Sequence, residues 1–426
     1  MNGIHRQLRD LMDAAVGEPP HRVSVAAVRR GVIRRRVGEC AAGVAAVAVI
    51  AAVVPAVVGS GTGPSAERPA VVPTLYVSNG GPGGDTVVPI TIATDTPGKP
   101  IKVGRDPGQI AITPDGKTAY VANLGSTTVT PIATATNKPG KPIKVGPNPA
   151  RFATRGISIA ITPDGQTAYV ANLASDIVTP ITISTNKRGK PIKVGRAPVS
   201  IAITPDGKTA YVANLDSATV TPITIATNKP GKPINVGSGP NRAVITPDGK
   251  TAYVANQNSG TVTPITIATD KPDKPIRVGS GFVAGIAITP DGKTVYVASE
   301  ASGTVTPIAT ATNRAGKPIK VGREPGQILI TPDGETAYVA NRNSGTVTPI
   351  TIASNTPGKP IHVGRLPAEM AITPDGKTVY VLAIYLGGIT PIATATNIPG
   401  EPIHVGYLAR AIAITPRPGR QRDHDS

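Results

Sequence analysis

The 426-residue chain contains no tryptophan, and aromatic residues make up only 3% of it. A hydrophobic core therefore has to be packed with Val, Ile, Ala and Thr, and repeats built on a Trp-Asp dipeptide are excluded. The single cysteine, Cys40, leaves no internal disulfide. The sequence shows no His/Cys/Asp cluster with metal-ligand spacing and no Cys-x-x-Cys-His haem signature. We therefore expect no bound metal and no cofactor.

Long stretches free of proline are also lacking between residues 74 and 416, where most of the 45 Pro and 47 Gly of the chain lie. This argues against helical repeats. What recurs instead is "TPDG", whose aspartate falls at positions 115, 164, 206, 248, 291, 333 and 375, with steps of 49, 42, 42, 43, 42 and 42 residues. Short β-branched runs between Gly/Pro turns at this period predict an all-β propeller of four-stranded blades.

One repeat divides into four predicted strands. They are "SIAI" (200–203), "AYVAN" (210–214), "TVTPITIAT" (219–227) and "PINVG" (233–237). "TPDGKT" forms the first turn, since Pro presets the backbone, Asp bonds locally and Gly closes the turn. "NKPGKP" is the predicted turn before the fourth strand, because Pro-Gly favours a type II turn. The TPDG aspartates are therefore interpreted as turn residues rather than catalytic ones.

The strand counts predict eight blades. The tyrosine of the second strand occurs eight times, as do the third and fourth strands, but only seven first strands precede a TPDG turn. An eighth first strand, "AIAIT" at 411–415, follows the last repeat. If it pairs with "LYVSN" at 75–79, it completes the remaining blade, closes the ring and removes two open edges. Seven blades with one frayed end are the alternative.

The pairing of "ITPDGKT" with "YVAN" resembles the YVTN-type β-propeller repeat of bacterial and archaeal surface or periplasmic proteins. The resemblance covers residues 74–416 and implies a propeller, with seven blades in the usual member. The wider superfamily is similar to the propellers of lactonases, amine dehydrogenase subunits and nitrite or nitrous-oxide reductases. The motif implies a fold and leaves the ligand open.

A basic and an apolar segment precede the propeller. Residues 1–36 are rich in arginine, and residues 40–58 are nineteen residues without a charge, enough to span a bilayer. We predict a cytoplasmic basic tail at 1–36, one transmembrane helix at 37–58, a flexible linker at 59–73 and a disordered basic tail at 417–426. The positive-inside rule then places the propeller outside the cell membrane. A cleaved signal peptide and a secreted domain are the alternative.

The formal net charge is +18, of which residues 1–66 supply only +4, from eight Arg against four acids. Much of the remainder is lysine that recurs in "GKPIKVG", the strand expected to be outermost. Lysine on an exposed edge discourages edge-to-edge pairing. It can also attract anionic wall polymers or phospholipid surfaces, whereas nucleic acid is not an expected partner of an exported domain.

The segments that break the repeat share one predicted face, formed by the second-to-third and fourth-to-first loops. A seven-residue insertion between Gly146 and Ile159 lies there, as do both Phe and the two Tyr outside the repeat. Arginine occurs in seven of the eight fourth-to-first loops and suits forked pairing with carboxylate or phosphate. The candidate ligand-binding residues are Arg105, Arg151, Phe152, Arg155, Arg196, Arg242, Phe282, Arg323, Arg365, Tyr385, Tyr407 and Arg410.

These features predict a membrane-anchored extracytoplasmic module that binds or scaffolds a protein or an anionic polymer through this variable face. A hydrolase of the lactonase kind, with its site at the channel mouth, is the second hypothesis. Such a site would need converging carboxylates, whereas the mouth is expected to be cationic. A structural component of the cell surface is the third. No Ser/His/Asp constellation stands out, so no catalytic residue is predicted.

Overall fold

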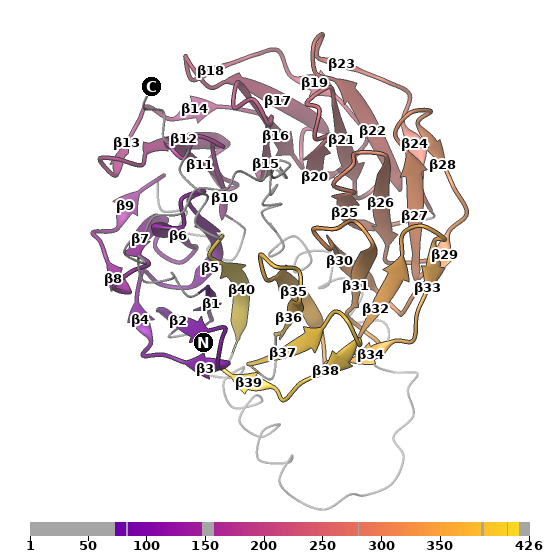
Figure 1. The fold of residues 1–426 in the computed structure, drawn as a ribbon. Coiled ribbons are helices and arrows are strands. Elements are labelled where there is room, and N and C mark those ends of the chain that lie inside the picture. The colour runs from indigo at the N-terminus through magenta and orange to yellow at the C-terminus, as the bar shows by residue number, and fades with distance from the viewer. Residues whose placement is uncertain are drawn as a thin grey trace, which may run out of the picture. The chain divides into compact units, whose positions relative to one another are not determined.

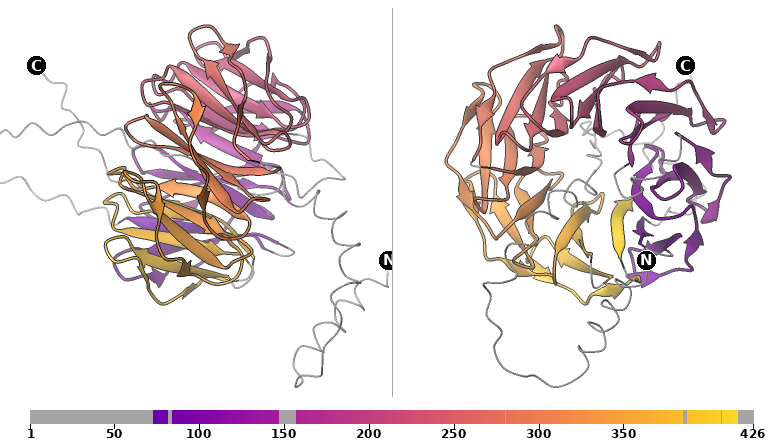
Figure 2. Two further views of the ribbon diagram at one scale, coloured as in Figure 1. Left: turned by 90° about the vertical axis from the view of Figure 1, so that its right-hand side faces the viewer. Right: turned by 180° about the vertical axis from the view of Figure 1, so that it is seen from behind.

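The computed structural model describes residues 73–81, 84–146, 157–279, 281–384, 387–406 and 408–416. They form eight antiparallel sheets arranged as blades around a central axis (Figure 1). Figure 2 shows the same ring from the side and from behind. The predictions of an all-β propeller and of eight blades are confirmed, and this part of the chain contains no helix.

Helices long and apolar enough to cross a membrane are consequently missing from the described ranges. The predicted transmembrane helix at 37–58 lies outside those ranges. So do the basic tail at 1–36, the C-terminal tail at 417–426 and the linker at 59–73 apart from Pro73. All four therefore remain predictions.

We number the blades 1 to 8 in chain order, and each has an innermost, a second, a third and an outer strand. The innermost strands, which surround the axis, are β40 (Ala409–Ile414), β5 (Pro107–Ile112), β10 (Ile157–Ile161), β15 (Pro198–Ile203), β20 (Pro240–Ile245), β25 (Val283–Ile288), β30 (Pro325–Ile330) and β35 (Pro367–Ile372). The second strands are β1 (Thr74–Asn79), β6 (Thr118–Asn123), β11 (Thr167–Asn172), β16 (Thr209–Asn214), β21 (Thr251–Asn256), β26 (Thr294–Ser299), β31 (Thr336–Asn341) and β36 (Thr378–Ala383).

The third strands are β2 (Thr86–Thr91), β7 (Thr128–Ala133), β12 (Ile177–Thr182), β17 (Thr219–Thr224), β22 (Thr261–Thr266), β27 (Thr304–Ala309), β32 (Thr346–Thr351) and β37 (Gly388–Ala393). The outer strands come in two pieces, namely β3 (Thr96–Pro97) and β4 (Ile101–Lys102), β8 (Lys138–Pro139) and β9 (Ile143–Lys144), β13 (Lys187–Arg188) and β14 (Ile192–Lys193), β18 (Lys229–Pro230) and β19 (Ile234–Asn235), β23 (Lys271–Pro272) and β24 (Ile276–Arg277), β28 (Arg314–Ala315) and β29 (Ile319–Lys320), β33 (Thr356–Pro357) and β34 (Ile361–His362), and β38 (Ile398–Pro399) and β39 (Ile403–His404).

The prediction of four strands per blade is therefore wrong, because every sheet has five. In blade 4 the outer strand is interrupted at "GKP". The N–H of Gly231 donates to the carbonyl of Pro222 at 2.7 Å, and Pro233 has no N–H with which to continue the ladder. The outer edge of each blade is thus two short strands joined by a kink.

The predicted turn at "NKPGKP" is also displaced. In blade 4 the third strand ends at Thr224, and the turn occupies residues 225–228. Asn228 closes it in the left-handed region, with φ of 54°, which asparagine tolerates better than most residues. The Lys-Pro pair that follows already belongs to β18.

The ring closes as predicted, with the last strand of the described residues completing the first blade. β40 pairs antiparallel with β1, from Leu75 opposite Ile414 to Asn79 opposite Ala409. In Figure 1 the two strands lie side by side, one at each end of the colour scale. The N–H of Thr74 also donates to the hydroxyl of Thr415 at 2.9 Å. Blade 1 therefore holds the two ends of the propeller together.

The repeat tyrosine joins neighbouring blades. Each of the eight is at most 1% exposed and donates its hydroxyl, at 2.5 to 2.7 Å, to an Asn or Asp at the left-handed turn of the next blade. The pairs are Tyr76–Asn137, Tyr120–Asn186, Tyr169–Asn228, Tyr211–Asp270, Tyr253–Asn313, Tyr296–Asn355, Tyr338–Asn397 and Tyr380–Asp95. The motif "YV" thus recurs because every blade junction needs the same polar link.

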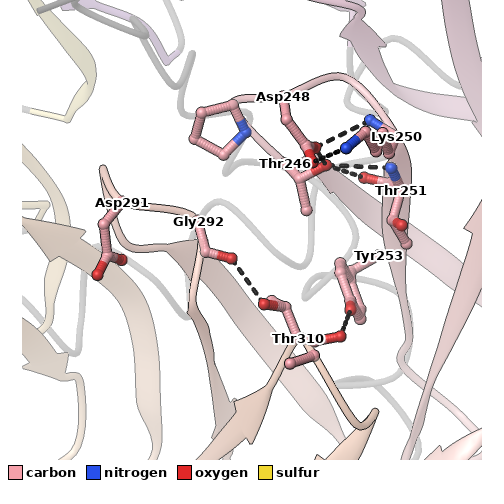
Figure 3. Close-up of a pocket in the computed structure, with 10 residues that line it drawn as sticks. Thr246, Asp248, Lys250, Thr251, Tyr253, Asp291, Gly292 and Thr310 are labelled. Atoms are coloured by element: carbon pink, nitrogen blue, oxygen red, sulfur yellow. Dashed lines mark hydrogen bonds and ion pairs between the residues drawn. The ribbon is translucent and has the colours of Figure 1, made fainter.

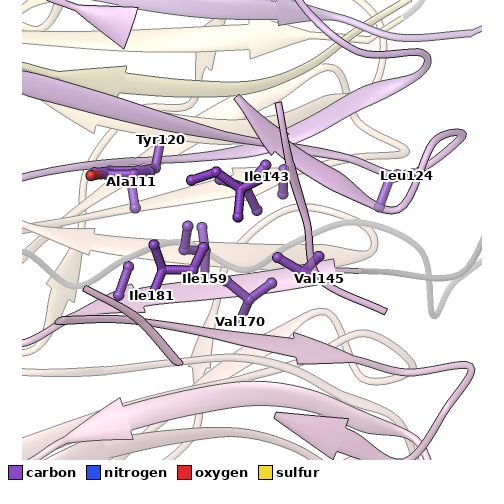
Figure 4. Packing of buried hydrophobic residues seen from close by; sticks show 11 residues of the cluster. Ala111, Tyr120, Leu124, Ile143, Val145, Ile159, Val170 and Ile181 are labelled. Atoms are coloured by element: carbon purple, nitrogen blue, oxygen red, sulfur yellow. The ribbon is translucent and has the colours of Figure 1, made fainter. Parts of the chain in front are cut away.

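Aliphatic side chains fill the space between blades. Figure 4 shows the junction of blades 2 and 3, where Leu124, Ile143 and Val145 of one blade face Val170 and Ile181 of the other. The tyrosine rings are among the largest fully buried side chains of the described blades. The core is thus a series of similar layers around the axis, and a site that departs from the repeat has to be sought where equivalent positions differ.

Candidate functional site

Seven of the twelve predicted ligand-binding residues lie in the part of the chain that the structure describes. The other five lie outside the described residues, namely Arg151, Phe152, Arg155, Tyr385 and Tyr407. Phe282 precedes β25 and is half-buried. Exposed loop arginines, as expected, precede blades 2, 4, 7 and 8, namely Arg105, Arg196, Arg323 and Arg365.

The remaining two arginines do not lie in loops. Arg242 is part of β20 and only 8% exposed, and Arg410 is part of β40. These innermost strands begin earlier than the hydrophobic run "AVI" or "AIAI" suggests, because Pro240 and Ala409 already pair with the second strand. Arg410 forms an ion pair with Asp106 of blade 2 at 3.1 Å, so its charge links blades 1 and 2.

One position on the innermost strands is aligned in all eight blades. In six blades it lies opposite the residue before the last of the second strand, such as Ala255 opposite Arg242. In blades 2 and 7, where the register is irregular, it is the residue before Ile110 or Ile328. From blade 1 to blade 8 the position is occupied by Ala411, Gln109, Ser158, Ser200, Arg242, Gly285, Gln327 and Glu369. We call it the ring position, and it is where the propeller departs most from its repeat.

Three ring side chains make the same contact. Gln109, Gln327 and Glu369 each accept a hydrogen bond from a backbone N–H of the next innermost strand, one residue after its ring position. The donor distances are 2.7 Å from Ile159 to Gln109 and 3.1 Å from Ile412 to Glu369. Each innermost strand is the inner edge of its sheet, and a buried N–H there needs a partner. Glu369 therefore does with a carboxyl group what the two glutamines do with an amide.

Charged side chains meet on blades 5 to 8 and form what we call the charged arc, defined as Arg242, Glu300, Glu324, Arg342 and Glu369. Arg242 and Glu369 interact electrostatically with each other, and both interact with Arg342. Arg342 lies 3.9 Å from Glu300, and Glu324 interacts with Glu300. Arg342 and Glu300 keep 20% and 16% of their side chains exposed, whereas Glu369 is only 5% exposed. The arc thus has a partly exposed level, formed by Arg342 and Glu300, and a buried floor, formed by Arg242 and Glu369.

Burial dominates the ionisation of the floor. It raises the pKa of Glu369 to about 7, against the Ile412 N–H and the guanidinium groups of Arg242 and Arg342, which lower it. Burial also lowers the pKa of Arg242 to about 10, although the nearby Glu369 acts to raise it. The carboxyl group therefore titrates near neutral pH beside a guanidinium that stays charged.

The residues that follow the second strands at the mouth also differ between blades. In blades 2 and 7 the residue after the second strand lies against the innermost strand, as Leu124 does against Gly108 and Arg342 against Gly326. This residue is leucine or isoleucine in blades 2, 3, 4 and 8, and Gln257, Glu300 or Arg342 in blades 5, 6 and 7. Comparing equivalent positions between repeats could have found Arg342 and Glu369 in the sequence, whereas the search for loop arginines did not.

A groove of about 260 Å³ lies on the opposite face, between blades 5 and 6 (Figure 3). It is lined by turn residues such as Asp248, Lys250 and Gly292, together with Tyr253 and Thr310. Asp248 and Lys250 are paired at 3.4 Å, and equivalents of most of these residues occur in every TPDG turn. The groove is thus a product of the repeat, and the charged arc is the better candidate site.

Within the described ranges, no three His, Cys, Asp or Glu residues are placed to hold a metal ion together. His362 and His404 occupy the same place on the outer strands β34 and β39, and both are exposed. At this position blades 1, 2, 3 and 6 carry lysine, blade 4 carries Asn235 and blade 5 carries Arg277.

Fold and site together define an eight-bladed propeller in which blades 5 to 8 carry a cluster of charged side chains at the channel mouth. A family model described as "Lactonase, 7-bladed beta-propeller" matches residues 98–237 and 234–357. The chain belongs to this family, and it has one blade more than the description states. No curated protein matches the chain.

Solved structures with a similar fold come from several functional settings. A chain titled "Kuenenia stuttgartiensis Hydrazine Synthase" is 26% identical, with a TM-score of 0.55 over 68% of this chain and 96% of that one. One titled "Dihydro-heme d1 dehydrogenase NirN in complex with DHE" is 14% identical, with a TM-score of 0.67 over 82% and 76%. A functionally unknown protein from Desulfotomaculum acetoxidans is 18% identical, with a TM-score of 0.55 over 80% and 99%. The last two likenesses concern the fold alone.

Proposed function

We propose that this protein is a binding propeller that holds a polar organic molecule at the charged arc. The observation that carries the proposal is the network of charges on blades 5 to 8, which includes Arg242 and Glu369, the only charged residues that are buried in the described ranges. A further half-buried ion pair, Arg410–Asp106, links only blades 1 and 2. Burying opposite charges is a poor source of stability compared with apolar packing, so the presence of Arg242 and Glu369 in a regular core needs another reason. Binding a ligand with both hydrogen-bond donors and acceptors is such a reason.

The composition of the arc favours a neutral or zwitterionic ligand over a polyanion. Two guanidinium groups face three carboxyl groups, of which Glu369 is protonated in part at neutral pH. Hydroxyl, amide or ammonium groups can bond to such a set, while a polyphosphate would meet repulsion from Glu300 and Glu324. The variable-face arginines could still hold an anionic polymer or a protein around the mouth, as the sequence suggests.

The cellular setting belongs to the same proposal. The basic tail and the transmembrane helix predicted at 37–58 would tether the propeller on the outer side of the cell membrane. The YVTN-type repeat, with its surface and periplasmic relatives, supports this placement. The ligand would then be a molecule of the extracytoplasmic space.

Lactone hydrolysis is the second candidate, and both the family match and Glu369 favour it. A carboxylate with a pKa of about 7 can act as a general base near neutral pH. Glu369 would take a proton from water as the oxygen attacks the lactone carbonyl, and Arg242 or Arg342 would stabilise the oxyanion. The ring C–O bond then breaks, the leaving oxygen is protonated, and a hydroxy acid results.

Replacing Arg342 and Glu300 together by Gln tests the binding proposal, because the pair is lost at constant net charge. The probes are glucono-δ-lactone, γ-butyrolactone, their hydroxy acids, neutral sugars and amino acids. We expect at least one probe to raise the melting temperature of the wild-type protein but not of this variant. Lys293→Gln with Glu335→Gln is the matched control, since both side chains are exposed on the opposite face. Equal probe shifts in all three proteins would refute the proposal.

The same panel separates binding from hydrolysis. Release of acid from a lactone, reduced by about 10²- to 10⁴-fold in Glu369→Gln, would establish hydrolysis at the arc. A melting-temperature shift without acid release would leave the binding function. Acid release that does not respond to Glu369→Gln would exclude the arc as the hydrolytic site.

A further inference from the structure

The outer edges of blades 2 and 3 carry an unbroken set of positive charges. The segments 137–146 and 186–195 contain seven cations and no acid. All seven side chains are exposed, and none forms an ion pair with another described residue. We call this set the cationic edge, and it consists of Lys138, Lys141, Lys144, Lys187, Arg188, Lys190 and Lys193.

Protection of exposed strands does not explain this set. If lysine served only to prevent edge pairing, every blade would need it equally, because every outer edge is equally open. The equivalent segment of blade 8, residues 397–406, has no Lys or Arg and carries Glu401 instead. Ile398 there takes the place of Lys138 and is 63% exposed. Blade 8 remains an open edge without the cations, so those on blades 2 and 3 have another role.

The arrangement of the outer strands indicates the shape of the partner. The second half of each outer strand contacts the first half of the next one, as β9 contacts β13, so the outer strands form a continuous curved band. Cations follow this band from Lys99 in blade 1 to Lys320 in blade 6 and become sparse in blades 7 and 8. Because cations continue over blades 4 to 6, they extend farther round the convex band than a flat lipid surface can touch. A flexible linear polymer can follow it from blade to blade.

We propose that the cationic edge binds a linear polyanion with closely spaced phosphate groups, which runs along the outer strands with its strongest contacts at blades 2 and 3. Binding releases counterions from the polymer and is therefore strongly salt-dependent. The many weak contacts add up because they are made by one chain. This surface is distinct from the charged arc, where the acidic side chains would repel the same polymer.

The test measures the affinity of the full chain, kept in neutral detergent, for linear inorganic polyphosphate at several salt concentrations. In the edge variant five cations of the cationic edge, Lys138, Lys141, Lys187, Arg188 and Lys190, are replaced by Gln. The matched variant loses five exposed lysines of the TPDG turns: Lys117, Lys208, Lys250, Lys293 and Lys377. Both variants lower the net charge by the same amount, and their melting temperatures report whether each one folds.

We expect the edge variant to bind polyphosphate roughly tenfold or more weakly, with a shallower salt dependence, and the matched variant to change by about twofold or less. Equal losses in both variants would overturn the proposal, because the attraction would then be diffuse. Unchanged binding in the edge variant would also overturn it. Vesicles of anionic phospholipid form a separate arm, and binding to vesicles but not to polyphosphate would assign the surface to a membrane instead.

Discussion

The hydroxyl of Tyr380 in blade 8 donates a hydrogen bond of 2.5 Å to Oδ1 of Asp95 in blade 1. These residues are 285 positions apart, and their contact repeats at the closing junction the link found at the other seven. Six of the eight acceptors are asparagine, whereas Asp95 and Asp270 carry a charge. The ring is thus closed twice, by this link and by the pairing of β1 with β40.

Replacing Asp95 by Ala is expected to destabilise the protein by about 2.5–5 kcal/mol. The buried Tyr380 hydroxyl loses a bond to a charged group, which contributes about 1.5–3 kcal/mol. Alanine also has to adopt the left-handed backbone of this position, with φ of 50°, at a cost of about 1–2 kcal/mol. Asp95→Asn is the control and should lose little, because asparagine serves at the equivalent turn of six other blades. Urea unfolding measures both, and equal losses would show that the link does not matter.

Truncation after Gly406 is expected to prevent stable folding of the propeller. It removes β40, which supplies the innermost strand of blade 1 and buries Ala409 and Ile412 against blades 1 and 8. The exposed edge of β1 would also invite association between molecules. Thermal unfolding and sedimentation report the effect. A truncated protein that melts like the intact one and stays monodisperse would contradict closure by β40.

Glu369 makes the stability of the protein depend on pH. Its pKa is about 7 in the folded protein, against an ordinary value of 4.5, so the folded state holds the proton more tightly. The resulting stabilisation is complete below about pH 4.5 and is lost as the pH rises through 7. Relative to the wild-type protein, Glu369→Gln should therefore gain stability between pH 5 and pH 8. Unfolding curves for the two proteins that shift in parallel with pH would show that Glu369 is not responsible.

Gly285 is predicted to tolerate no side chain. An added Cβ would lie 2.1 Å from the carbonyl oxygen of Gly326 on the neighbouring innermost strand, so Gly285→Ala forces the two strands apart. We expect a loss of about 3 kcal/mol, at the upper end for overpacking. Gly326→Ala is a close control, because its nearest neighbour would be 3.6 Å away. If both variants melt alike, the approach of β25 and β30 is looser than described.

The predicted topology can be tested on intact cells. A propeller tethered outside the membrane by residues 37–58 should be degraded by added protease, leaving a small N-terminal fragment with the membrane. A secreted form would instead be recovered from the medium without residues 1–58. Full-length protein that stays soluble in the cytoplasm and is protected from protease would contradict both expectations.

The sequence by itself determined the blade period, the blade count and the closure of the ring. These depend on short-range signals that recur in every repeat, such as the TPDG turn and the tyrosine of the second strand. It did not predict the broken outer strand, since the proline-rich "KPGKP" reads as a turn when the neighbouring third strand is unknown. In the structure, the same residues pair at both ends and kink only at Gly231 and its equivalents.

Only the tertiary structure decided which side chains share a site. Arg242 and Glu369 are 127 residues apart and belong to blades 5 and 8, and nothing local marks either of them as a partner of the other. Their interaction depends on the curvature of the closed ring, which brings the ring positions of separate blades toward one axis. The pKa of Glu369 follows from the same packing, because a carboxyl group in a sequence has no burial until the neighbouring blades surround it.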